Sequence, residues 1–373
     1  MDLMKKAGII THYNVHNHGA HLQLYALSKT LQELGYDAKA LQFSKNYDFM
    51  GGPEIAKKYN VSIRSIPVYL RYLRKNGLKR TLYNVKKRKL LAAFREQKQL
   101  VGEYYSKASD LDAVVIGSDE IFSIEAGPNP WYYGIGVPCK KQISYAASFG
   151  PTTASMVEER NVEGMIAAGL HGLSAISVRD GNSAEIVKSL VGEEPSIVCD
   201  PVLLYDFHDE ISNEKMASFR KAHPEKYCIV YAYDDHVNDD GSTQAIRAYA
   251  KKQGWKVYSV AYYHKWCDKN VQVAPLDVFQ WFRGAEAVFT DTFHGTVLSL
   301  VTGTQFVSKV SGNRNKLDYL LRQYGVADRE TDGFERLEEI MGTPMDYQTV
   351  GNRIVEIRGE SMDFLKNALK SLE

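Results

Sequence analysis

Cysteine patterns typical of zinc sites and disulfide scaffolds are missing from this sequence. The chain has 373 residues and four cysteines, and no two of them form a CxxC pair. We therefore expect no structural zinc site. No other cluster of metal-ligating residues stands out in the sequence, so we expect no metal centre. Isolated cysteines of this kind are typical of proteins in a reducing compartment, where they serve as small buried side chains. The four are Cys139, Cys199, Cys228 and Cys267.

Long apolar runs and an excess of one charge are missing as well. No stretch approaches the roughly 18 apolar residues of a membrane-spanning helix, and the apolar run near the N-terminus is too short for the core of a signal peptide. The net charge of +1 gives no overall attraction to nucleic acid or to a membrane. With 44% hydrophobic and 24% charged residues, the composition is that of an ordinary globular protein. We expect a cytoplasmic protein that binds no nucleic acid.

The first predicted strand–helix–strand unit has no GxGxxG motif, so it carries no dinucleotide fingerprint. Apolar residues 7–11 predict a strand, 22–34 have helical spacing up to Gly35, and 37–43 alternate as a second strand. The loop between the first strand and the helix contains Asn17 and Gly19. Two interpretations stay open there, because the two residues could place backbone amides near a ligand or could form an ordinary turn.

Further along the chain, polar residues come shortly after each of four apolar segments. Each segment is short enough for a buried strand, and the carboxyl ends of parallel strands meet at one edge of a sheet, where ligands bind. The sequence therefore predicts a cleft on that side. The residues at these ends are Ser118 and Asp119 after 113–116, Ser148 after 141–147, Arg179 after 175–178, and Asp200 after 196–198.

A second series of apolar segments predicts another α/β half. We expect strands at 227–232, 256–261, 287–290 and 305–310. The predicted architecture is α/β, with a Rossmann-like domain over 1–203, a second over 204–345, and a cleft between them. Residues 346–373 form a terminal helix that crosses back onto the first domain. A helical insertion covers about 50–110 of the first domain.

The stretch FTDTFHGTVLSL, residues 289–300, concentrates polar residues between a strand and a helix. We expect the strand to end at Thr290, a polar turn to contain Thr292, His294 and Gly295, and a helix to start at Thr296. A histidine at a strand end suits acid–base chemistry, since its pKa lies near neutrality. The alternative is a capped helix with an incidental histidine.

The insertion is strongly basic between Arg71 and Lys98. This stretch holds eleven Lys and Arg residues against the single acid Glu96. One interpretation is a solvated helical face. The other is peripheral contact with the inner membrane or with a lipid-diphosphate carrier, which a basic amphipathic segment fits.

The motifs, in this order, resemble those of the polysaccharide pyruvyl transferase family. The resemblance implies two Rossmann-like domains that face an interdomain cleft, similar to the GT-B glycosyltransferases. It spans roughly residues 7–326 and starts with GIITHYNVHNHGAHLQLYALSKTLQELGYDA. It continues through VVIGSDEIF, ISYAASFG, SAISVRDGNSAEIV, CDPVLL, PLDVFQWFRGAEAVFTDTFHGTVLSLVTGTQFV and NKLDYLLRQYG.

The reaction that the resemblance implies is pyruvate transfer from phosphoenolpyruvate to two hydroxyls of a sugar, which gives a cyclic ketal and phosphate. No cofactor is expected, and the acceptor belongs to a polysaccharide, a capsule or exopolysaccharide, or to its lipid-linked precursor. His294 would act as acid or base, Asp119 as a base or a turn cap, and Arg179 as an anion ligand or the partner of Asp180. Substrate contacts would come from Asn17, Gly19, Ser118, Ser148, Thr292, Gly295, Arg314 and Lys316, with Lys309 a weaker candidate.

Thr292 departs from a pattern found in several pyruvyl transferases, which carry arginine two residues before the histidine. A threonine cannot bind phosphate bidentately. The Ser/Thr-Phe-His-Gly form resembles a recurrent branch of the family. Two other functions stay open: a GT-B-like glycosyltransferase that uses a nucleotide sugar, and a non-catalytic bilobal carbohydrate-binding protein.

Overall fold

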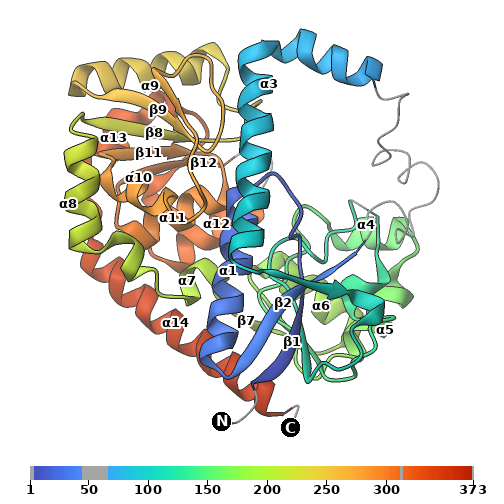
Figure 1. Cartoon of the computed structure of the whole chain (residues 1–373). Helices are drawn as coiled ribbons and strands as arrows, with labels where there is room; N and C mark the ends of the chain where they lie inside the picture. The colour runs from blue at the N-terminus through green and yellow to red at the C-terminus, as the bar shows by residue number, and fades with distance from the viewer. Residues whose placement is uncertain (1–3, 44–65, 126, 311–313, 372–373) are drawn as a thin grey trace. The chain divides into compact units, whose positions relative to one another are not determined.

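A computed structural model describes residues 4–43, 66–125, 127–310 and 314–371. The chain divides into two compact units (Figure 1). Unit 1 comprises Met1–Gly77, Arg95–Tyr205 and Glu356–Glu373, and unit 2 comprises Leu78–Phe94 and Asp206–Val355. Each unit is an α/β domain built on a parallel sheet, as the sequence predicted.

The sheet of unit 1 has five strands in the order β3-β2-β1-β4-β5. Neighbouring strands of this sheet are parallel, and β1 pairs with both β2 and β4. This is the order of a Rossmann-like half, in which the direction of winding reverses between β1 and β4. The strands are β1 Lys5–Ile10, β2 Tyr36–Gln42, β3 Val101–Tyr104, β4 Ala113–Ile116 and β5 Gln142–Ser144; β6 Ser177–Val178 and β7 Ser196–Ile197 form a two-stranded extension.

Helices cover the two faces of this sheet. The apolar residues of α1 are buried, and α1 packs beside α7. The opposite core combines strand residues such as Ile10, Val114 and Ile116 with the aromatic residues Phe122 and Trp131. The helices of this unit are α1 His18–Glu33, α4 Ala154–Glu159, α5 Glu163–His171, α6 Gly181–Val191 and α7 Pro201–Leu204.

The sheet of unit 2 has six parallel strands in the order β10-β9-β8-β11-β12-β13. The central pair is β8 and β11, where Thr290 lies opposite Tyr231, and the winding reverses between these two strands. Ala287–Val288–Phe289–Thr290 is buried throughout, as a strand covered on both faces requires. The strands are β8 Tyr227–Tyr231, β9 Lys256–Val260, β10 Lys269–Val271, β11 Ala287–Thr290, β12 Phe306–Lys309 and β13 Glu330–Thr331.

Two sets of helices cover the sheet of unit 2 (Figure 1). On one face, α9 and α13 bury residues such as Ile246 and Ile340 against Val230 and Phe289. On the other face, Phe282 of α10 stacks edge-on against Tyr231, and α10 packs on α8 and α11. The helices are α8 Asn213–Ala222, α9 Asp240–Gln253, α10 Val278–Gly284, α11 Phe293–Thr302, α12 Arg314–Gln323 and α13 Leu337–Gly342.

Two long helices contribute residues to both units. Helix α3, Ile66–Gln97, has non-helical dihedrals at Gly77, and its Leu78–Phe94 part belongs to unit 2. Helix α14, Tyr347–Lys370, contributes its last part to unit 1, where Ser361 accepts a hydrogen bond from the Cys199 amide. None of the helices in the described ranges combines the length and apolarity that a membrane span requires.

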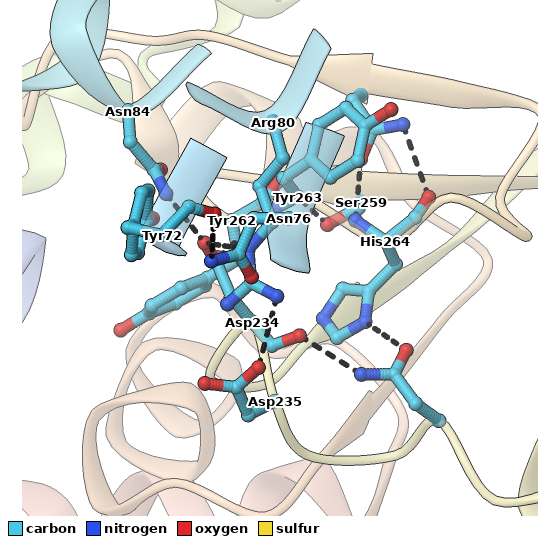
Figure 2. A network of polar contacts seen from close by, with 12 residues as sticks. Tyr72, Asn76, Arg80, Asn84, Asp234, Asp235, Ser259, Tyr262, Tyr263 and His264 are labelled. Atoms are coloured by element: carbon cyan, nitrogen blue, oxygen red, sulfur yellow. Dashed lines mark hydrogen bonds and ion pairs between the residues drawn. The ribbon is translucent and has the colours of Figure 1, made fainter. Parts of the chain in front are cut away.

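Arg80 anchors the Leu78–Phe94 part of α3 within unit 2. Its guanidinium pairs with Asp234 at 3.2 Å and with Asp235 at 2.9 Å, and Asn84 donates to Asp234 as well (Figure 2). One turn on, the Tyr83 hydroxyl donates to the carbonyl of Val271. We predicted that the whole insertion belongs to the first domain. The structure differs, because these polar contacts attach half of α3 to unit 2, and because 101–104 form the edge strand β3.

Candidate active site

Several of the predicted site residues lie at the carboxyl ends of the two central strands of a sheet, where the winding reverses. Asn17 and Gly19 follow β1 in unit 1, and Ser118 and Asp119 follow β4. In unit 2, Thr292 follows β11. In doubly wound sheets this position opens a crevice between adjacent loops, where ligands bind. Each unit therefore has its own candidate half-site.

Arg179 is the centre of the half-site in unit 1. Its guanidinium donates to Asp200 at 2.8 Å and to Asp119 at 3.2 Å, and its side chain is only 2% exposed. The attraction of the two carboxylates raises the pKa of Arg179 against the effect of burial, which lowers it. Arg179 therefore pairs with two distant carboxylates, and Asp180, its chain neighbour, caps α6 instead.

Asp119 lies in a sharp turn of the backbone after β4. Asp119 has φ of 71°, and the preceding Gly117–Ser118 peptide bond is cis. Gly117 has φ of 128°, and a Cβ there would lie 2.0 Å from the Tyr145 carbonyl oxygen. Only glycine therefore fits at 117. The Asp119 side chain, two residues on, is 18% exposed.

The remaining predicted residues of unit 1 are engaged in hydrogen bonds with the protein. Ser118 donates to Gln23 of α1 at 2.9 Å, and Ser148 donates to Asp180 at 2.7 Å. Asn17 caps α1 and accepts a hydrogen bond from the Gly19 amide at 2.8 Å. The helix therefore starts at His18, earlier than we predicted.

Sequence reasoning missed Arg95 as part of this half-site. Arg95 lies within 2.7 Å of the buried His21 ring and donates to Asn14 at 3.3 Å. It therefore brings a cation to the loop after β1. We had counted it only among the cations of the basic insertion, since nothing in the sequence relates it to residues 74 positions away.

In unit 2, Thr292 is the N-cap of α11. Its hydroxyl oxygen accepts a hydrogen bond from the Gly295 amide at 2.9 Å, which satisfies one free N–H of the first turn. We expected the helix to start at Thr296, but it starts at Phe293, and so His294 lies inside the first turn. The His294 residue is 7% exposed.

Gly295 is fixed by close packing. A Cβ at this position would lie 2.1 Å from the Thr290 hydroxyl oxygen and 2.8 Å from that of Thr292. Both hydroxyls lie at the carboxyl end of β11, and that of Thr290 donates a hydrogen bond to the Tyr231 carbonyl at 2.6 Å. The glycine therefore allows α11 to begin directly against β11, which holds His294 at the strand end.

The predicted cations of this unit lie in α12 and at the end of β12. Arg314 and Lys316 belong to its first turn, and the Arg314 side chain lies outside the described residues. Lys309 ends β12 and donates to Ser242 at 3.2 Å. Lys309 thus reaches the start of α9 from the neighbouring strand.

Sequence reasoning missed a histidine–aspartate pair at this edge of the sheet. His236, in the loop after β8, has its Nδ1 atom 2.5 Å from Oδ2 of Asp291, the residue after β11. Asp291 is part of the polar FTDTFHG stretch, but no motif marks His236. Among the described residues, no group of three or more His, Cys, Asp or Glu side chains could hold a metal ion.

Solved structures with a similar fold cover nearly the whole chain. UGT89C1 of Arabidopsis thaliana, complexed with UDP-L-rhamnose, has a TM-score of 0.53 at 14% identity and covers 99% of both chains. The UDP-GlcNAc 2-epimerase of Methanocaldococcus jannaschii has a TM-score of 0.50 at 13% identity, over 96% of this chain and 100% of that one. At these identities the likeness concerns the fold, which is that of two Rossmann-like domains, as in GT-B proteins.

The family is shown by sequence. No curated protein matches the chain. The family model described as polysaccharide pyruvyl transferase matches residues 17–311, which include the α1 cap, the Arg179 cluster and the FTDTFHG stretch. The chain belongs to the polysaccharide pyruvyl transferase family.

Proposed function

We propose that this protein transfers pyruvate from phosphoenolpyruvate to two hydroxyls of one sugar, and so forms a cyclic ketal and inorganic phosphate. The acceptor sugar belongs to a polysaccharide or to its lipid-linked precursor. The family match over residues 17–311 carries the proposal. Phosphoenolpyruvate is the donor substrate, and the reaction uses no cofactor.

His294 is the proposed general acid. Transfer begins when a proton adds to the methylene carbon of the enol, which creates a cationic centre that a hydroxyl can attack. Imidazole suits this step, since its pKa lies near neutrality. His294 lies in the first turn of α11, where N–H groups and the helix dipole favour a neighbouring anion.

The phosphate of the donor needs a cation, and Arg314 and Lys316 are the proposed ligands in unit 2. Both lie in the first turn of α12. Arg179 is a weaker phosphate ligand than its sequence position indicated, because Asp119 and Asp200 already neutralise its charge. We assign Arg179 the role of holding Asp119, the proposed contact to a substrate hydroxyl in unit 1.

Phosphate release tests the donor. Purified protein is incubated with phosphoenolpyruvate and a p-nitrophenyl sugar, and inorganic phosphate is measured with and without the sugar. We expect sugar-dependent release that falls by at least about 100-fold in His294→Gln, with His208→Gln as the control, since His208 is exposed and pairs with the exposed Asp209. Transfer from a nucleotide sugar instead would favour the glycosyltransferase, and binding of sugar with no turnover of either donor would favour a carbohydrate-binding protein.

Contact with an anionic membrane is the second part of the proposal, since a lipid-linked acceptor lies at a bilayer surface. Leu78, Leu82 and Val85 recur along one face of α3 with exposures of 64%, 51% and 48%. Exposed lysines flank them, and Tyr83 and Lys87 of the opposite face are buried. A basic helix with an exposed apolar stripe fits the surface of a bilayer that contains anionic lipid.

Vesicle sedimentation tests this surface separately from catalysis. We expect binding to vesicles that contain phosphatidylglycerol, weaker binding to pure phosphatidylcholine, and loss of the difference in the double variant Lys79→Glu/Lys86→Glu. The double variant Lys140→Glu/Lys141→Glu is the matched control, because it makes the same change of charge at exposed residues that are not part of α3. Equal binding by the two double variants would contradict a specific surface.

A further inference from the structure

The loops after β8 and β11 bring His236 and Asp291 together. Nδ1 of His236 and Oδ2 of Asp291 are 2.5 Å apart. The Asp291 side chain is 5% exposed, whereas that of His236 is 54% exposed. The aspartate is thus held inside the protein, and the histidine presents the rest of its ring to the surface.

The surrounding backbone holds the histidine in place. Val237, the next residue, has φ of 52°, a conformation that costs a β-branched residue free energy. Val237 is 5% exposed, and its burial in the unit 2 core maintains this conformation. On the other side, the ring of Tyr233 packs edge-on against that of His236 at 5.4 Å. The position of His236 is therefore determined by packing and by Asp291.

A pocket of about 300 Å³ opens beside this pair. Its volume is enough for a monosaccharide unit, since ligand pockets begin at roughly this size. Three carboxylates line it, those of Asp235, Asp239 and Asp291, against one lysine, Lys309. Lys309 lies 3.7 Å from Asp239, which offsets its charge. Arg80 pairs with Asp235 in the same way, at 2.9 Å. The carboxylate oxygens that line the pocket accept hydrogen bonds from hydroxyls, so the pocket suits a polyol.

We propose that His236 is the general base for the acceptor hydroxyl and that Asp291 is the residue that positions it. This inference rests on the proposed function, and it assigns to this pocket the acceptor hydroxyl that loses its proton, for which that function named only a contact with Asp119. The hydrogen bond to Asp291 requires the proton on Nδ1, so that Nε2 has the lone pair that a hydroxyl proton needs.

The proton balance of the reaction gives His236 a defined step. The acceptor oxygen forms a bond to C2 of the enolpyruvyl group while its proton passes to Nε2 of His236, and a proton from the general acid adds to C3. The C2–O bond to phosphate then breaks, the phosphate takes the electron pair, and the second hydroxyl closes the ketal at C2. Of the two hydroxyl protons lost, one balances the proton gained at C3 and the other leaves with phosphate.

Asp119 is the competing base, and its surroundings make it the weaker one. Its carboxylate pairs with the buried Arg179, and a neighbouring cation favours the charged form of a carboxyl group over the protonated form that a base must adopt. Asp291, in contrast, contacts Nδ1 of His236, which leaves Nε2 to accept the hydroxyl proton.

Nitrogen NMR of the histidine rings tests the pair without any substrate. The His236 signals are assigned by their loss in His236→Gln. At a pH where the ring is neutral, we expect the proton on Nδ1 in the wild-type protein and a shift toward Nε2 in Asp291→Asn. A wild-type ring that carries its proton on Nε2 overturns the proposal, whatever reaction the protein catalyses.

Steady-state kinetics with phosphoenolpyruvate and a p-nitrophenyl sugar tests the role. We expect kcat to fall about 100- to 10,000-fold in His236→Gln, with the KM for phosphoenolpyruvate nearly unchanged, and added imidazole to restore part of the activity of His236→Ala. In Asp291→Asn we expect a smaller loss of kcat than in His236→Gln, together with the change of His236 tautomer in the nitrogen spectrum, which a merely structural role would not produce.

The outcomes separate this inference from the proposed function. If the wild-type protein releases no phosphate with any sugar, the proposed function fails, and the nitrogen spectra still decide the tautomer of His236. If the wild-type protein is active and His236→Gln keeps its kcat, the inference fails while the proposed function stands. His208→Gln, which changes an exposed histidine, is the matched control and should match the wild-type rate.

Discussion

Arg179 and Asp200 form a buried ion pair, with Nη1 and Oδ2 2.8 Å apart and side chains that are 2% and 0% exposed. Asp200 also caps α7 through the Val202 amide. The pair therefore joins the end of β6 to the start of a helix, and Asp119 adds a second carboxylate from the loop after β4. This cluster fixes three loops of unit 1 relative to one another.

Removing the guanidinium should destabilise the protein strongly. In Arg179→Ala, two carboxylates lose their cation inside the fold, and we expect the free energy of unfolding to fall by about 3–5 kcal/mol. Urea denaturation of the wild-type and variant proteins measures this change in the free energy of unfolding. Asp119→Asn removes only the partly exposed partner and should cost less. If Arg179→Ala cost no more than Asp119→Asn, the cluster would not hold the fold as argued.

Gly295 should tolerate no side chain. In Gly295→Ala the new methyl group meets two threonine hydroxyls at 2.1 and 2.8 Å, so α11 must move away from β11, and we expect a loss of stability of about 1–3 kcal/mol together with loss of transferase activity. Gly359→Ala is the control, because nothing lies within 4 Å of a Cβ there and alanine favours a helix interior by about 0.5–1 kcal/mol. Equal effects of the two substitutions would contradict the packing argument.

The Thr292 hydroxyl should matter as a helix cap. We expect Thr292→Ala to lower the free energy of unfolding by about 1 kcal/mol, because the Gly295 amide loses its acceptor. Thr292→Ser keeps the oxygen and should stay close to the wild-type value in the same denaturation experiment. A serine variant as unstable as the alanine variant would show that the methyl group matters instead.

The sequence predicted the parts of this fold that local patterns determine. Short apolar segments that end in polar residues correctly predicted the parallel sheets, because a buried strand needs apolar side chains on both faces. The start of α11 was wrong by three residues, since Thr292 resembles the turn residues around it and only its bond to the Gly295 amide shows that it is the cap.

Local sequence patterns could not predict contacts between residues that are distant in the chain. His236 and Asp291 are 55 residues apart and meet because β8 and β11 are adjacent strands. Arg179 similarly finds Asp119 and Asp200 instead of its neighbour Asp180. The same limit applies to α3, where the basic composition of the helix gave no sign that Tyr83 and Lys87 are buried in unit 2.

Lys87 is a basic residue on the buried face of α3. It is 6% exposed, and its Nζ atom lies 4.1 Å from the centroid of the Tyr262 ring. Burial lowers the pKa of Lys87 to about 8, and the charge of Asp234 opposes this effect in part. A lysine with a lowered pKa makes the stability of the fold depend on pH.

The sign of this dependence follows from proton counting. Between about pH 8 and pH 10.5 the unfolded chain keeps the lysine proton while the folded protein loses it, so the contribution of Lys87 to stability rises with pH by up to about 1.4 kcal/mol per unit. Below pH 8 Lys87 is protonated in both the folded and the unfolded state, so the folded protein bears the full free-energy cost of burying the charge. We therefore expect Lys87→Met to raise the free energy of unfolding most, relative to the wild-type protein, near pH 7. This gain should shrink as the pH rises toward 10.

Urea denaturation of both proteins at several pH values measures the difference in the free energy of unfolding. The titrations of tyrosines and cysteines are common to both proteins and cancel in this difference. Lys86→Met, at an exposed position one residue away, should show a constant difference, and a constant difference for Lys87→Met would mean that this ammonium stays charged inside the fold.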